Sequence, residues 1–329
     1  MLGKLKLALE QGDPPMACRI RIKEPGACQW FHVNAHITCC EGEYPLEEEI
    51  CRDKLIEIIK HYAHAYFCEV AAFSIMGNHY HLVVRMDEER PLTDEEKWER
   101  AFRLFPGASR DDILAWPPKR WQRLDKRLFD ISELMRNIQA MFGRWYNDRI
   151  RRRGGVWAGR FRSTLLATKA AVVECMLYVD LNGVRAGLVT RPEDHEGSSL
   201  HLRARGQDRW LMPLIKLIGT GNRTKQLAAY RRRLYRRGAV PTKENHAQIN
   251  EKLLAEEERR DFVPRGAYRQ RLRYWTDGLI IGSEEQIRKK LAALRKAGIY
   301  KRRAHPIAQQ KKLHLSLREQ RGHGQGFIH

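Results

Sequence analysis

Two pairs of residues in this chain have the types and the spacing that phosphodiester chemistry requires. His79 and His81 alternate through the strand-like run IMGNHYHLVVRM, and the period of two of a β-strand places both imidazoles on one face of a sheet. Tyr178 and Asn182 are four residues apart in the helix-like run ECMLYVDLNGVRAGLV, which also places them on one face. Two imidazoles and an amide oxygen can hold a divalent cation with open positions, and a tyrosine hydroxyl beside it can attack a phosphodiester. The combination predicts DNA strand cleavage through a covalent tyrosine link.

Each pair has a simpler interpretation when it is taken alone. Two histidines on a strand can be surface residues, a tyrosine in an amphipathic helix usually packs, and an asparagine before a glycine usually ends a helix. On this last ground Gly183 is expected to stop the helix. We expect four other histidines to lie at the surface: His32 and His36 on the first strand and His61 and His64 on the first helix. The joint pattern therefore carries the prediction.

The composition restricts the class of protein. The formal net charge of +21 favours a polyanionic partner, because clustered Lys and Arg gain affinity by releasing the counterions of phosphates. We expect no transmembrane helix and no secretory leader, because the chain has no run of 18 apolar residues and its first residues have too short an apolar segment. The seven cysteines form no CxxC pair, which argues against a zinc site and a disulfide framework and favours reduced thiols in the cytoplasm.

The order of expected elements indicates the fold class. Strands are expected at 30–38, 67–77, 79–86 and 156–168, and helices at 46–66, 130–150 and 169–182. The resulting order, β-α-β-β-α-β followed by a helix, predicts an α+β fold of the ferredoxin-like (RRM-like) type. Its sheet would be antiparallel, with helices on one face.

The chain divides into three parts on the same basis. Residues 1–29 are a weakly structured lead-in, and residues 30–196 form the main domain. The charged segment 87–129, interrupted by prolines, is expected to be a helical insertion within that domain. Residues 197–329 are expected to be a basic, mainly helical region with helices at 247–260 and 284–298. Its dense arginine run at 231–237 suggests that it adds DNA affinity rather than chemistry.

The joint pattern resembles the single-tyrosine HUH transposases, most closely the REP-associated tyrosine transposase group. The family's histidine motif typically reads M-P-N-H-x-H-L-L, and MGNHYHLVV (76–84) matches it. Its W-x-x-R-F-x-S motif is matched by WAGRFRS (157–163), and its Y-I-x-x-N-P-V-R-A-G-L-V motif by YVDLNGVRAGLV (178–189). The three motifs occur in the family's order within residues 30–190. Gly77 and Gly183 stand where the family usually has proline, at backbone positions beside the expected site.

The resemblance implies a metal-dependent nuclease and strand transferase acting on single-stranded DNA with hairpins or inverted repeats. Such a protein is expected to be a nucleoid-associated homodimer in the cytoplasm, with a monomer as the alternative. His79, His81 and Asn182 would ligate Mg²⁺ or Mn²⁺, of which imidazole favours Mn²⁺. Tyr178 would attack the phosphate and give a 5′-phosphotyrosine and a free 3′-OH. The ester conserves the bond energy, in agreement with a sequence that has no GxxxxGK[ST] phosphate loop.

Basic residues near these motifs are the candidates for holding phosphates. They are Arg151, Arg152, Arg153, Arg160, Arg162 and Arg185. Trp157 and Phe161 can stack on bases or pack in the core.

Two other functions remain open at this stage. One is a domesticated relative that binds hairpin DNA or RNA without cutting it. The other is a replication-initiation or relaxase-type HUH nuclease, although those commonly carry a helicase domain or several catalytic tyrosines. The presence of His79, His81, Tyr178 and Asn182 together favours the transposase-like enzyme.

Overall fold

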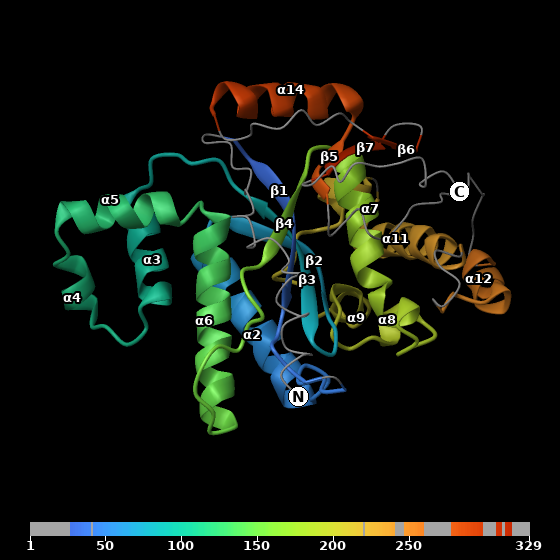
Figure 1. Cartoon of the computed structure of the whole chain (residues 1–329), viewed down its shortest axis with the longest axis horizontal. Helices are drawn as coiled ribbons and strands as arrows, with labels where there is room; N and C mark the ends of the chain where they lie inside the picture. Colours follow the sequence, from blue (N-terminus) through green and yellow to red (C-terminus); the bar gives the residue numbers. More distant parts are fainter. Residues whose placement is uncertain are drawn as a thin grey trace, which may run out of the picture.

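The computed structural model describes residues 27–40, 42–219, 221–240, 247–259, 278–298, 307–310 and 313–317. In these residues seven strands form one sheet in the order β2-β3-β1-β4-β5-β7-β6, which crosses the centre of Figure 1. The strands are β1 (Gln29–His36), β2 (Cys68–Ile75), β3 (His79–Met86), β4 (Arg162–Leu166), β5 (Gly278–Gly282), β6 (Ile307–Gln310) and β7 (Leu313–Leu317). The predicted α+β class is confirmed.

The first four strands form the antiparallel part of the sheet. β1 lies between β3 and β4, with His36 opposite His79 and Asn34 opposite both His81 and Arg162. β2 pairs with β3 on its other edge. The four strands predicted from the sequence are confirmed, but β4 is shorter than the expected 156–168. Residues 156–161 contribute only an isolated bridge between Trp157 and Ile37.

Helices cover both faces of this sheet, so the expectation of helices on one face is wrong. Helices α2 (Glu49–Ala65) and α6 (Ile131–Arg149) pack on one face, and α7 (Lys169–Asp180) and α11 (Arg223–Gly238) pack on the other (Figure 1). The alternation of side chains along a strand explains this result. Leu82 of β3 lies in the hydrophobic core on the side of α2 and α6, called the first core. Val83 lies in the core on the side of α7 and α11, called the second core, so both faces carry apolar residues that must be covered.

The expectation of a purely antiparallel sheet is also wrong, because β5 pairs with β4 in parallel. Parallel neighbours need a long connection, and the chain reaches β5 through the helices that follow β4. β7 then pairs antiparallel with β5 and β6 with β7. The C-terminal region is therefore less exclusively helical than expected. Its side chains enter both cores that the first part of the chain forms, with Ile280 in one and Ile281 in the other.

Residues between β3 and α6 form three helices, as expected for the segment 87–129. They are α3 (Asp94–Leu104), α4 (Arg110–Leu114) and α5 (Pro118–Arg127), and they enclose a small core of their own. Thr93 begins α3 with a capping box to Glu96, and Pro118 occupies the first turn of α5. The insertion lies beyond α6, far from α7 (Figure 1).

Shorter helices follow α7 and connect it to the rest of the chain. They are α8 (Asn182–Arg185), the 3₁₀ helix η1 (Pro192–Asp194), α9 (Ser199–Ala204) and α10 (Ile215–Ile218). The helices expected at 247–260 and 284–298 are observed as α12 (Glu251–Glu258) and α14 (Glu284–Lys296). Among the described residues no helix combines the length and apolar character needed to cross a bilayer, and the six described cysteines are free thiols.

A buried carboxylate at the end of α7 ties this helix to the C-terminal region. Asp180 is fully buried and accepts hydrogen bonds from the hydroxyl of Ser199 at 2.7 Å and that of Tyr230, on α11, at 2.5 Å. Burial raises the pKa of Asp180, and these hydrogen bonds oppose the shift. The position of α7 therefore depends on residues more than 40 positions further along the chain.

We predict that Tyr230→Phe lowers the free energy of unfolding by about 1–3 kcal/mol, because it removes one donor from a buried carboxylate. Chemical denaturation monitored by circular dichroism measures the loss. Tyr44→Phe is the control, since Tyr44 is 51% exposed. Equal stability of the two variants would show that the hydrogen bond to Asp180 does not hold α7.

Candidate functional site

A layer of polar side chains lies between the sheet and α7. On β1, Phe31 and Val33 point into the first core, so His32 and Asn34 point to the opposite face, toward α7. The same alternation on β3 places His79 and His81 on that face, because Tyr80 and Leu82 belong to the first core. The prediction that the two histidines share one face is confirmed.

His32 was expected at the surface, and this expectation is wrong. It is 1% exposed, and its Nε2 lies 3.1 Å from Nδ1 of His81, with the two rings stacked. The strand alternation that faces His81 toward α7 also faces His32 there, so α7 covers both. His36 is exposed, but its ring stacks on that of His79 with centroids 4.8 Å apart. The site therefore holds four histidines rather than two.

The hydrogen-bond partners of the two motif histidines allow a tautomer in which Nε2 of each ring keeps its lone pair. Nδ1 of His79 lies 2.9 Å from the side-chain oxygen of Asn78, a geometry that suits an Nδ1–H donor and leaves Nε2 with its lone pair. When Nδ1 of His81 carries the proton, it donates to His32 and likewise leaves Nε2 as an acceptor. Burial lowers the pKa of His79 to about 4 and that of His81 well below its usual value, with neighbouring histidines adding to both shifts. Both imidazoles are therefore neutral at pH 7.

His32, His36, His79 and His81 together form a histidine layer. Tyr178 lies beside it. Its ring meets His81 edge-on at 5.6 Å between centroids and His32 at 5.8 Å. The guanidinium of Arg185 lies 5.7 Å from the centre of the tyrosine ring and donates to the Tyr178 carbonyl at 3.5 Å. Tyr178 is 9% exposed. His81 and Tyr178, almost 100 positions apart in the sequence, thus lie in contact.

Asn182 lies one helical turn after Tyr178. It opens α8, which continues α7 almost without a break, since Leu181 still donates to the carbonyl of Leu177. Its side-chain nitrogen is buried and has no hydrogen-bond partner in the described part of the chain. The amide is therefore available to a ligand, and an exchange of its nitrogen and oxygen positions would present the oxygen instead.

The donor set of His79, His81 and Asn182 fits a divalent cation in its chemistry. Metal-bound imidazoles are neutral and usually donate their second nitrogen to a neighbour, as both histidines can here. The described residues contain no group of three His, Cys, Asp or Glu side chains that could hold a metal ion. A cation held by His79 and His81 would therefore need a third ligand of another type, and the amide of Asn182 is the candidate that the sequence predicts.

The six arginines predicted to hold phosphates occupy different environments. Arg151, Arg152 and Arg153 are exposed in the turn after α6 and make no hydrogen bond to the histidine layer among the described contacts. Arg160 is exposed, and Arg162 lies near His36, where it reinforces the lowering of the His36 pKa by burial.

Arg185 differs from these, because it is only 8% exposed and contacts Tyr178 rather than solvent. Burial lowers its pKa to about 10, so it stays cationic at neutral pH. The two aromatic candidates pack inside the protein: Phe161 is 7% exposed, and Trp157 donates to the carbonyl of Gln139 at 2.8 Å.

The two glycines in the motifs allow close approach of neighbouring side chains. Gly183 does not end the helix as expected but lies buried inside α8. A Cβ at Gly183 would be 2.7 Å from Cγ of His195, and one at Gly77 would be 2.6 Å from Cδ1 of Tyr44. His195 is 8% exposed, and burial lowers its pKa to about 4. The space beside Gly183 is therefore filled by a histidine that the motifs do not include.

Comparison with known proteins gives one distant similarity. No protein-family model and no curated protein matches the chain. A solved structure described as a REP-associated tyrosine transposase bound to a REP hairpin is similar over 60% of this chain and 89% of that chain. The identity is 16% and the TM-score 0.37.

We predict that Gly183→Ala destabilises the protein by about 1–3 kcal/mol, because the new methyl group overlaps His195 in a packed region. The double variant Gly183→Ala/His195→Ala should lose less stability than the sum of the two single variants, since truncation of the histidine makes room for the methyl group. Denaturant unfolding of the four proteins measures the coupling. If the stability losses of the two single variants simply add in the double variant, the methyl group at position 183 does not overlap the side chain of His195.

Proposed function

We propose that this protein cleaves and rejoins single-stranded DNA through a covalent tyrosine intermediate, as a single-tyrosine HUH transposase built on a ferredoxin-like core. The observation that carries the proposal is the packing of Tyr178 against His81 on the buried polar face of the sheet. It brings the candidate nucleophile beside the ring of a candidate metal ligand. The substrate class is hairpin or repeat DNA, and the assembly is a homodimer.

Tyr178 and Arg185 carry the cleavage step. The hydroxyl oxygen of Tyr178 attacks the scissile phosphorus, the bond from phosphorus to the 3′ oxygen breaks, and that oxygen leaves as a free 3′-OH. The proton lost by the tyrosine passes to solvent, and solvent protonates the departing oxygen. Arg185 holds a positive charge beside Tyr178 and favours the phenolate form during attack.

The histidines and Asn182 bind and orient rather than react. His79, His81 and Asn182 would hold Mg²⁺ or Mn²⁺, which when bound polarises the phosphate and stabilises its developing charge. His32 fixes the ring of His81 through the 3.1 Å contact between their nitrogens. A 3′-OH can later attack the phosphotyrosine and reseal the strand. No nucleotide hydrolysis is required, because the ester retains the bond energy.

One observation favours the alternative, a hairpin-binding protein that does not cut. Tyr178 exposes only 9% of its surface, so a phosphate can reach its hydroxyl only from a restricted direction. The covalent test below separates the two functions.

We predict a denaturation-resistant protein–DNA adduct when the protein is incubated with Mn²⁺ and labelled hairpin-containing single strands. Gel electrophoresis under denaturing conditions detects it. Tyr178→Phe, which lacks only the hydroxyl, should abolish the adduct, and a chelator should prevent it in the wild type. Tyr146→Phe is a matched control, because Tyr146 lies on α6 on the other face of the sheet. Hairpin binding without any adduct would support the non-cleaving alternative.

We predict that His32→Phe weakens Mn²⁺ binding roughly 10–100-fold, because it keeps a ring but removes the partner of His81. Isothermal titration measures the affinity, and thermal unfolding verifies that the fold is retained. His64→Phe replaces an exposed histidine on α2 and should leave Mn²⁺ affinity unchanged. If both variants bind Mn²⁺ as the wild type does, His32 does not position the metal ligand.

A further inference from the structure

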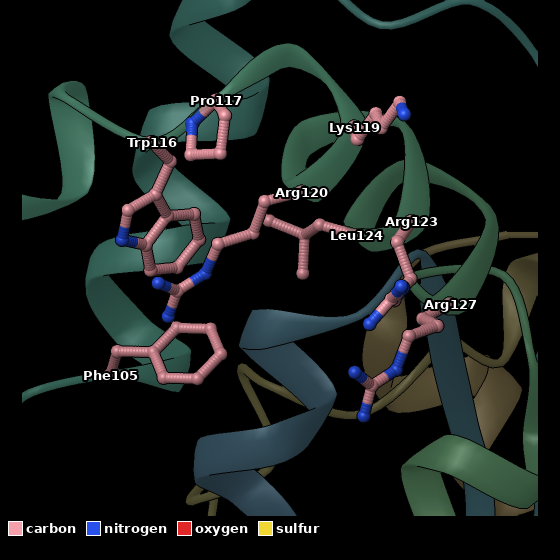
Figure 2. Close-up of a pocket in the computed structure, with 8 residues that line it drawn as sticks. All are labelled: Phe105, Trp116, Pro117, Lys119, Arg120, Arg123, Leu124 and Arg127. Carbon is pink, nitrogen blue, oxygen red and sulfur yellow. The ribbon is translucent and has the colours of Figure 1, made fainter.

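The helical insertion contains a cavity that the proposed chemistry does not use. Its volume is about 390 Å³, and it opens between α5 and the segments that precede it (Figure 2). Phe105 and Trp116 form one wall, and Lys119, Arg120 and Arg123 project from α5 around it. No carboxylate lines the cavity. It therefore combines aromatic surface with concentrated positive charge.

The aromatic wall offers a fixed platform. Trp116 is 8% exposed and is held by Trp121, with ring centroids 5.1 Å apart. Phe105 meets Trp116 edge-on at 5.0 Å and is 37% exposed, so part of its ring is open to a ligand. The guanidinium of Arg120 lies 3.7 Å from the Trp116 ring centre. A flat cation thus already occupies the stacking position on the tryptophan.

The positive charge of the cavity is not neutralised within the described protein. Arg127, at its far end, forms an ion pair with Glu133. Lys119, Arg120 and Arg123 have no carboxylate partner among the described residues, and all three are exposed. Arg120 and Arg123 are one helical turn apart and therefore point to the same side of α5. Two free cations beside an aromatic platform are the elements of a site for single-stranded nucleic acid.

We infer that this cavity binds an unpaired stretch of single-stranded DNA, with one base stacked on Trp116 and Phe105 and the adjoining phosphates held by Arg120 and Arg123. The entering base takes the place of the Arg120 guanidinium, which then turns to a phosphate. The site lies in the insertion, across the sheet from α7, so it is separate from the Tyr178 centre (Figure 1). The inference goes beyond the proposed cleavage, because binding here needs neither the metal nor Tyr178.

Binding of a fluorescent thirty-nucleotide oligo-dT to the full-length Tyr178→Phe protein in chelator tests the inference without any contribution from cleavage. Arg120→Gln/Arg123→Gln should weaken binding about tenfold or more at low salt. It should also reduce the slope of log affinity against log salt by about 1.4, since each phosphate contact on a single strand contributes about 0.7. Arg110→Gln/Lys126→Gln removes the same charge from the same insertion but outside the cavity, and should change the slope little.

Phe105→Ala tests the stacking separately from the charge. We expect it to weaken oligo-dT roughly 5–100-fold, the range for loss of one stacked base, without altering the salt slope. It should not affect an abasic oligonucleotide of the same length. Crosslinking with 5-iodouracil in the oligonucleotide should mark the peptide that contains Trp116.

Three outcomes would overturn the inference. The first is equal weakening by the cavity and control double variants, which would mean that only overall charge matters. The second is an equal effect of Phe105→Ala on abasic DNA and oligo-dT. The third is competition by polyglutamate as strong as that by oligo-dT at equal charge, which would indicate an acidic protein partner. None of these results would bear on covalent cleavage by Tyr178.

Discussion

Burial of imidazoles between the sheet and α7 is the constraint on which the site depends. His32 and His81 are almost inaccessible to water, so each must find its hydrogen-bond partner inside the protein. They satisfy this need through each other, at 3.1 Å. The same burial keeps both rings next to Tyr178 and makes the charged form of His81 unfavourable. A helix that packed less closely would admit water and release the rings, so the chemistry proposed here requires the close packing of α7.

The close packing of α7 in turn depends on the C-terminal region. Tyr230 and Leu234 of α11 are fully buried in the core that contains α7, and Tyr230 donates to Asp180. Arg203 donates to the carbonyls of Ala71 and Met212, which joins α9 to β2. The residues after 197 were expected to add DNA affinity, and that role stays a prediction. In the structure several of them also hold α7, the helix that carries Tyr178, against the sheet.

Local patterns predicted most of the elements and the shared face of His79 and His81, because the periods of a strand (2 residues) and a helix (3.6 residues) can be recognised from neighbouring positions in the sequence. The tertiary arrangement could not be predicted from such local patterns. The burial of His32 depends on α7 crossing above β1, and the parallel partner of β4 comes from more than 100 residues downstream. The contact of His195 with Gly183 also appears only in the folded chain.

The distribution of charge separates structural cations from those available to a polyanion. In the arginine run of α11, Arg231 pairs with Glu193 and Glu257, and Arg236 pairs with Glu258. Such arginines are already neutralised and would lose these partners on binding a phosphate. Arg120 and Arg123 in the insertion have no carboxylate to lose among the described residues. The density of arginine along the sequence is therefore a poor guide to where a polyanion would bind. The absence of nearby carboxylates is the better criterion, and Arg120 and Arg123 of α5 meet it, whereas Arg231 and Arg236 of α11 do not.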